Sequence, residues 1–160
     1  MSDTLKSMLR IAPPLGGISV VLDDGGRAAA GFQGTTGDCV TRAVAIATGK
    51  PYREVYDAIN GLAKTERVTK KMRGGRSSSR TGVHKKTSRR FLESLGWIWT
   101  PTMFIGSGCK VHLRRDELPA GRLVVKVSRH MCAVIDGVVH DTYDPSRGGM
   151  RCVYGYWRQP

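Results

Sequence analysis

The chain has 160 residues and a mass of 17.5 kDa, the size of one ordinary domain with its own apolar core. Apolar residues make up 40% of it, but no apolar run approaches the roughly 18 residues of a membrane span, which excludes a transmembrane protein. The formal net charge is +13. No apolar stretch follows a basic start, so we expect no export by the secretory route.

The positive charge is concentrated in one stretch. Ten of the 26 Lys and Arg residues lie between positions 66 and 90, beside a single acid, Glu66. Such a run can bind a nucleic-acid backbone or an acidic partner, or it can be a solvated loop, and the residues leave these interpretations open. No aromatic side chain alternates with the charges, which argues against a stacking platform for single-stranded nucleic acid. The candidate contacts to a polyanion are Lys70, Lys71, Arg73, Arg76, Arg80, Lys85 and Lys86.

The first half of the chain is predicted to form a lead-in arm, a strand, two helices and a loop. Residues 1–15 mix polar residues with two prolines and are expected to form the arm. A short apolar strand at 17–22 ends at an Asp-Asp-Gly-Gly turn. Residues 39–48 are apolar nearly all round and predict a buried helix ended by glycine, and 52–60 carry apolar residues at helical spacing. The Gly-rich and Ser-rich basic residues of 64–86 predict a flexible loop, little of it buried.

The second half is predicted to be mainly strand. A short helix is expected to be capped by Thr87 and to end at Gly96, and residues 101–121 are expected to be irregular. Asp136-Gly137 is a strong signal for a two-residue hairpin. Helices come mostly first and strands later, so we expect one α+β domain over residues 1–160 with an antiparallel sheet. The expected strands are 97–100, 123–127, 129–135, 138–143 and 153–157.

The cysteines are too few and too scattered for a disulfide scaffold. We therefore expect free thiols and a cytoplasmic location. No C-x-x-C pair is present, and the spacing of the cysteines relative to His112 matches no standard zinc pattern, so we expect neither a metal nor a cofactor. The four cysteines are Cys39, Cys109, Cys132 and Cys152.

Cys39 is a candidate nucleophile because of its place at the start of the expected buried helix. The positive end of a helix dipole favours the thiolate form of cysteine. An isolated cysteine is more often a small core residue, and this alternative stays open without a base nearby. A thiol nucleophile needs a general base, which in turn needs an orienting partner.

The expected hairpin selects a base and its partner. If Asp136 and Gly137 are the two loop residues, alternation along the strands places His130 and Asp141 on one face as diagonal neighbours. A carboxylate there can hold the imidazole for catalysis, or the two can form a purely structural hydrogen bond. A shift of one residue in register would separate them.

Gln33 stands six residues before Cys39 in a loop. Acyl transfer by a thiol needs hydrogen-bond donors for the developing oxyanion. The amide of Gln33 and the backbone N–H of Cys39 could supply two.

The motif Gln-Gly-x-x-Gly-x-Cys at 33–39, followed by a histidine on one strand and an aspartate on the next, resembles the papain-like cysteine peptidases. The resemblance implies a nucleophile-bearing helix packed on an antiparallel sheet. It also implies Cys39 as nucleophile, His130 as base, Asp141 as orienting residue and Gln33 in the oxyanion hole. Asp38 replaces the family's usual serine, and its carboxylate can either cap the helix or oppose thiolate formation.

The expected function is therefore that of a thiol hydrolase, which cleaves an amide in a protein or peptide substrate through an acyl-thioester on Cys39. An acyltransferase or transglutaminase-like enzyme with the same triad is one alternative. The other is a non-catalytic basic protein on the same fold, which binds nucleic acid or is part of a phage particle. The chain also resembles small bacteriophage proteins, which implies the host cytoplasm or the virion as its location.

Overall fold

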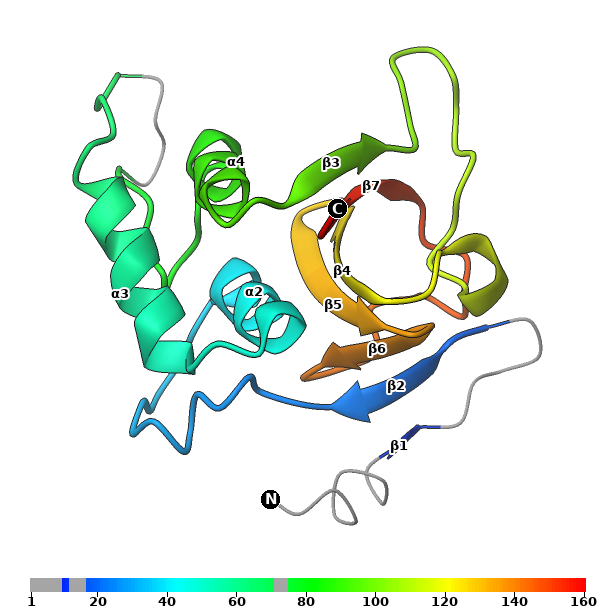
Figure 1. The fold of residues 1–160 in the computed structure, drawn as a ribbon, viewed down its shortest axis with the longest axis horizontal. Helices are drawn as coiled ribbons and strands as arrows, with labels where there is room; N and C mark the ends of the chain where they lie inside the picture. The colour runs from blue at the N-terminus through cyan, green and yellow to red at the C-terminus, as the bar shows by residue number, and fades with distance from the viewer. Residues whose placement is uncertain (1–9, 12–16, 71–74) are drawn as a thin grey trace.

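The α-helices lie on one side of a curved β-sheet (Figure 1), and the first of them packs against it. The computed structural model of the chain describes residues 10–11, 17–70 and 75–160. The expected arm at 1–15 lies outside the described residues, apart from 10–11. The helices are α2 (Cys39–Thr48), α3 (Tyr52–Ala63), α4 (Lys85–Ser94) and the short 3₁₀ helix η1 (Arg115–Glu117). The strands are β1 (Arg10–Ile11), β2 (Ser19–Leu22), β3 (Ile98–Pro101), β4 (Arg122–Val127), β5 (His130–Ile135), β6 (Val138–Asp141) and β7 (Val153–Arg158).

The α+β class is confirmed, but the sheet is mixed rather than antiparallel. The described residues form a seven-stranded sheet in the order β1-β2-β6-β5-β4-β7-β3. Strand β2 pairs in parallel with β6, whereas the other neighbours are antiparallel. Parallel neighbours need a long connection, and here the chain from β2 to β6 includes all three α-helices and three further strands. The parallel pairing of β2 with β6 therefore joins distant segments, and no local sequence pattern predicts it.

The hairpin between β5 and β6 has the predicted register. Ile135 pairs with Val138, and the next pair inward is Val134 with Val139. Asp136 and Gly137 form the turn with φ of 48° and 73°. A type I′ turn requires positive φ at both central residues, and an Asp-Gly pair meets this requirement at low cost.

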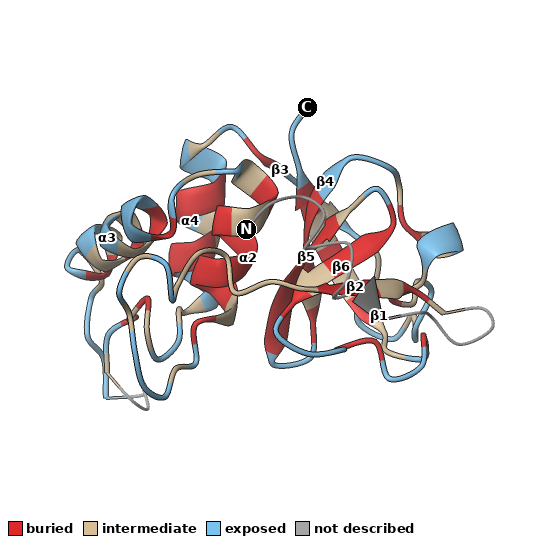
Figure 2. Cartoon of the chain, turned by 90° about the horizontal axis from the view of Figure 1, so that it is seen from below, coloured by how far each residue is buried: buried red, intermediate tan, exposed pale blue. Residues whose placement is uncertain are grey.

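The core lies on both faces of the sheet. Helix α2 is placed between the sheet and the outer helices α3 and α4 (Figure 1), and its side chains pack on β5. Figure 2 shows buried residues along α2 and the central strands, and exposed residues on the outer side of α3. The helix-side cluster includes Val44, Ile59, Leu92, Val124 and Ala133. The cluster on the opposite face includes Ile18, Leu113, Val125, Val134 and Val139.

Part of the basic stretch is more ordered by contacts than its composition predicts. We expected little of residues 64–86 to be buried, and this is wrong for Ser77 and Ser79, which are 6% and 0% exposed. The backbone N–H of Ser79 donates to Asn60 of α3 at 2.9 Å, and its carbonyl accepts from Thr41 of α2 at 2.8 Å. Polar side chains on neighbouring helices thus satisfy this backbone, so the segment packs without apolar residues.

The start of α4 also differs from the prediction. The helix begins at Lys85, with His84 at the N-cap position, and Thr87 is buried inside its first turn. The Thr87 hydroxyl donates to the carboxylate of Glu66, which also accepts from Ser77. Thr87 therefore ties α4 to the basic stretch and does not cap the helix.

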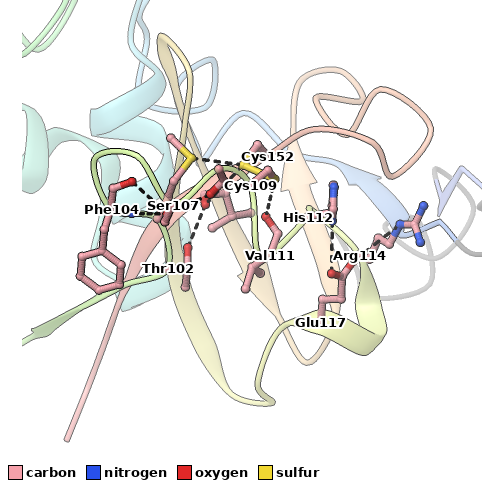
Figure 3. The surroundings of a disulfide bond; sticks show 12 residues. Thr102, Phe104, Ser107, Cys109, Val111, His112, Arg114, Glu117 and Cys152 are labelled. Atoms are coloured by element: carbon pink, nitrogen blue, oxygen red, sulfur yellow. Dashed lines mark hydrogen bonds and ion pairs between the residues drawn. A yellow bond between two sulfur atoms is a disulfide. The ribbon is translucent and has the colours of Figure 1, made fainter.

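The prediction of four free thiols is wrong for two of them. Cys109 and Cys152 form a disulfide, whereas Cys39 and Cys132 are free. Figure 3 shows how the bond fastens the loop between β3 and η1 to the residue before β7. Thr102, in the same loop, donates to the carbonyl of Val153 at 2.8 Å. The cytoplasmic location was inferred from free thiols and stays a prediction.

In the described part of the chain, every helix is too short or too polar to cross a lipid bilayer.

Candidate active site

Cys39 is the first residue of α2 and is partly buried. The positive end of the helix dipole acts on the thiol, and the first turn of the helix carries no acidic side chain that would offset this positive charge. The backbone N–H of Cys39 belongs to the first turn and has no carbonyl acceptor within the helix. The position thus provides both a thiol that is easily ionised and a nearby hydrogen-bond donor.

His130 and Asp141 are in direct contact, as the hairpin register predicts. The ring Nε2 of His130 lies 2.6 Å from Oδ2 of Asp141, and both side chains are buried. Oδ1 of the same carboxylate accepts the backbone N–H of Thr142 at 2.7 Å. The ring of Tyr143 lies beside the imidazole, with centroids 5.3 Å apart. The carboxylate therefore fixes the orientation of the ring and leaves Nδ1 for another partner.

That partner is the thiol of Cys39, which is hydrogen-bonded to the His130 side chain. Burial raises the pKa of Cys39, but the hydrogen bonds from His130 and from the backbone of Met131, with the charges of His130 and Arg42, outweigh it. The pKa of Cys39 consequently lies below its ordinary value of 9.0. Burial lowers the pKa of His130, yet its hydrogen bonds to Asp141 and Cys39 outweigh this, so it lies above 6.5. Both shifts favour a thiolate beside an imidazolium.

A buried chain of charged groups extends from Asp141 into the protein. Nη2 of Arg42 lies 2.9 Å from Oδ1 of Asp141, and its Nη1 lies 2.5 Å from Oδ1 of Asp38. The hydroxyl of Tyr52 donates to the other oxygen of Asp38 at 2.6 Å. Asp38 occupies the N-cap position but makes no side-chain cap hydrogen bond. Its carboxylate is paired with Arg42, so its charge is partly screened from the thiol.

An open cleft of about 770 Å³ lies over Cys39 and His130. One wall contains Thr36 and Gly37, which both donate to the carbonyl of Arg80, at 3.0 and 2.7 Å. A Cβ on Gly37 would lie 3.1 Å from the carbonyl oxygen of Thr81, so only a glycine leaves this approach uncrowded. The two loops are thereby joined into one wall, and the thiol is accessible from solvent through the cleft.

Gln33 is not brought into this cleft. Its side chain is exposed, and it is absent from the residues that line the cleft. Its backbone carbonyl is held instead, by Arg27 at 3.1 Å and by Arg80 at 2.6 Å. The loop that carries Gln33 is therefore anchored by its backbone, and the oxyanion role of the amide stays a prediction.

The candidate polyanion contacts are spread over different surroundings. Lys71 and Arg73 lie outside the described residues. Arg80 is engaged with the loop of Gln33, and Lys85 begins α4. Those with exposed side chains are Lys70, Arg76, Lys85 and Lys86.

Sequence reasoning missed Arg42 and Tyr52. The available signal was that Arg42 is the only charged residue within an otherwise apolar helix. A charge on a buried helix needs a partner of opposite sign, because an unpaired buried charge is very costly. Asp38 and Asp141 are those partners, but only the fold places Asp141 within reach.

In the described residues, no group of three or more His, Cys, Asp and Glu side chains is arranged to hold a metal ion. Comparisons with protein-family models, with curated proteins and with solved structures found no match for this chain.

Proposed function

We propose that the protein is a thiol hydrolase of the cysteine-peptidase type, which cleaves a peptide or isopeptide amide through an acyl-thioester on Cys39. The observation that carries the proposal is the position of His130, hydrogen-bonded on one side to the Cys39 thiol and on the other to Asp141. A structural histidine–aspartate pair would not need a thiol on its second nitrogen beside an open cleft. The resemblance to papain-like peptidases agrees with this proposal.

In the first half of the reaction, the Cys39 thiolate attacks the carbonyl carbon of the substrate while His130 is protonated. A carbon–sulfur bond forms, and the carbonyl electrons move onto the oxygen. We expect the backbone N–H of Cys39 to donate to this oxyanion. The intermediate then collapses, the carbon–nitrogen bond breaks, and the proton of His130 goes to the leaving amine.

In the second half, neutral His130 takes a proton from a water molecule, whose oxygen attacks the thioester carbon. The carbon–sulfur bond breaks, the acid product leaves and the thiolate beside the imidazolium is restored. Asp141 keeps the imidazole oriented and stabilises its positive charge throughout. Arg42 holds Asp141 in turn through its 2.9 Å contact.

The test is a peptide and isopeptide substrate screen with the wild type and Cys39→Ala. We expect products only from the wild type, and a mass increase on the peptide containing Cys39 that equals the acyl part of the substrate. Equal product formation by Cys39→Ala would contradict the proposal. Added amines distinguish an acyltransferase, because they would then divert most of the acyl group from water.

A second candidate is a basic protein that binds a polyanion. Arg67, Lys86 and Arg90 line a hollow of about 500 Å³ between the basic stretch and α4, with Glu66 as the acid there. Binding to DNA that falls steeply with salt, weakens in Lys86→Gln/Arg90→Gln and is unchanged in Cys39→Ala would support this function. Deletion of residues 66–90 is unsuitable as a test of binding, because it also removes buried Ser79 and the N-terminal part of α4.

A further inference from the structure

The cleft over Cys39 is positively charged once the pairing of its side chains is considered. Its cations are Arg27, Arg42, Lys126 and Arg129, and its acids are Asp24 and Asp38. Both acids are already engaged within the protein. The two oxygens of Asp24 accept the backbone N–H groups of residues 26 and 28, each at 2.9 Å, and Asp38 is held by Arg42. Arg42 is used in this pairing, so Arg27, Lys126 and Arg129 are the cations of the cleft that no acid of the cleft pairs with.

Lys126 lies close enough to Cys39 for the charge of the thiolate to act on it. It lies on β4, partly buried, and burial lowers the pKa of its ammonium group while the charge of Cys39 raises it. Within the described residues, no carboxylate lies at ion-pair distance from Lys126 or from Arg129. Arg129 directly precedes His130 and is exposed, with a positive φ of 56°. A partly buried lysine without a counter-ion is costly, and an anion bound in the cleft would offset this cost.

A second, smaller pocket adjoins the cleft, and Lys126 lines both. It has a volume of about 80 Å³ and an apolar floor that includes Val83, Trp99 and Trp157. Its rim carries Lys85 and Arg89 in addition to Lys126. An apolar side chain fits the floor, and a carboxylate next to it would meet the cationic rim.

We propose that the site takes an acidic peptide as its acyl donor, with a carboxylate bound between Lys126 and Arg129 and an apolar side chain in the adjoining pocket. This inference rests on the proposed function, since it names the substrate class of the same thiol. The carboxylate stays unchanged in the reaction and serves only to position the carbonyl group over Cys39. Arg27, the remaining cation that no acid of the cleft pairs with, already donates to two backbone carbonyls at 3.1 and 2.9 Å and is therefore less free to bind it.

Two small alkylating reagents test the anion subsite without knowledge of the substrate. Iodoacetate carries a carboxylate and iodoacetamide is neutral, and both form the same carbon–sulfur bond with a thiolate and release iodide. The ratio of their rate constants at Cys39, measured by peptide mapping, cancels any change in the fraction of thiolate. Glutathione provides the ratio for a thiol without a subsite.

We expect the iodoacetate-to-iodoacetamide ratio at Cys39 to exceed that of glutathione by about tenfold at low salt, and to fall by about fivefold in Lys126→Met. Lys126→Arg should keep most of the preference, and exposed Arg129→Met should lower it without disturbing the sheet. Lys64→Met, which removes an exposed charge just after α3, is the matched control and should leave the ratio unchanged. A peptide with Glu beside an apolar residue should also protect Cys39 from iodoacetamide better than its Gln counterpart.

The outcomes separate this inference from the proposed function. Fast, selective iodoacetamide labelling of Cys39 with the ratio of glutathione, unchanged in Lys126→Met and Arg129→Met, would overturn the anion subsite and leave the thiol hydrolase intact. Equal protection by the Glu and Gln peptides would overturn the acidic-peptide assignment. Slow labelling of Cys39 by both reagents would overturn the reactive thiol, and the substrate class with it.

Discussion

Nη2 of Arg42 lies 2.9 Å from Oδ1 of Asp141, the carboxylate whose other oxygen contacts His130. The same guanidinium also contacts Asp38, so one cation is shared by two buried carboxylates. Helix α2 thus supplies both Cys39, at its first residue, and the cation that holds the carboxylate of Asp141. A buried ion pair of this kind adds little stability as a whole. Removal of only one partner is strongly destabilising, because it leaves the other charge buried and unpaired.

Arg42→Met is therefore predicted to lower the free energy of unfolding by about 3–5 kcal/mol, because two carboxylates are left buried without their partner. Chemical denaturation followed by circular dichroism measures this change. Arg67→Met, on the exposed basic stretch, is the control and should stay within about 0.5 kcal/mol of the wild type. Asp38→Asn added to Arg42→Met should recover part of the loss. A loss below about 1 kcal/mol in Arg42→Met would contradict the network.

The disulfide predicts a measurable count of thiols. Protein purified without reductant should release only two reactive thiols after denaturation, those of Cys39 and Cys132. The bond joins residues 43 apart, and reducing it should lower the free energy of unfolding by about 2–4 kcal/mol. Cys109→Ser/Cys152→Ser should reproduce that loss and should no longer respond to reductant. Four thiols in the denatured, unreduced protein would show that the bond is absent.

Two glycines predict opposite effects of alanine. A Cβ at Gly155 on β7 would lie 2.4 Å from the ring of Trp99 on the paired strand β3. Gly155→Ala should consequently cost about 1–3 kcal/mol of stability. Gly61 lies in α3 with no atom within 4 Å of an added Cβ, so Gly61→Ala should stabilise by about 0.5–1 kcal/mol. Thermal unfolding of the two variants checks this pair, and a destabilised Gly61→Ala or a neutral Gly155→Ala would contradict the packing.

The local parts of the fold could be predicted from the sequence. Helix α2 ends at Gly49, whose φ of 73° and N–H bond to the carbonyl of Ala45 at 3.0 Å match a glycine C-cap. The Asp-Gly turn fixed the register of β5 and β6, and with it the contact of His130 with Asp141. Both features depend on a few neighbouring residues, which is why their chemistry can be read from the sequence.

The long-range parts could not be predicted. The parallel pairing of β2 with β6 and the disulfide between Cys109 and Cys152 join segments that meet only after folding. The burial of Ser79 depends in the same way on polar partners from α2 and α3. Composition favours a solvated loop for such residues, and only the tertiary contacts override it.

The sequence motif gives Gln33 a role that its position does not favour. Its side chain is exposed and lies outside the residues lining the cleft, so we expect Gln33→Ala to lower the turnover of a cleaved substrate by less than tenfold. Loss of a true oxyanion donor typically costs about 100-fold to 1,000-fold. A loss of that size, with Gln33→Glu equally impaired, would place the amide in the oxyanion hole of the substrate complex. Steady-state rates on one substrate decide between these results.

The pKa shifts predict how activity depends on pH. The pKa of Cys39 is lowered from 9.0 and that of His130 is raised from 6.5, and both shifts favour the reactive pair of thiolate and imidazolium. Activity should fall on the acid side as the thiolate is protonated. It should fall on the alkaline side as His130 loses the proton that the leaving amine needs.

The pH dependence of iodoacetamide labelling at Cys39 tests the thiolate–imidazolium pair most directly. In the wild type, the midpoint should lie below 9.0, because stabilisation by His130 outweighs burial, and buried Cys132 should react far more slowly. In His130→Ala, and in His130→Gln as the better-packed variant, the midpoint should move upward. Burial raises the pKa of Cys39, and the histidine that lowers this pKa is then missing. A wild-type midpoint at or above 9.0 that neither variant shifts would contradict the catalytic pairing of Cys39 with His130.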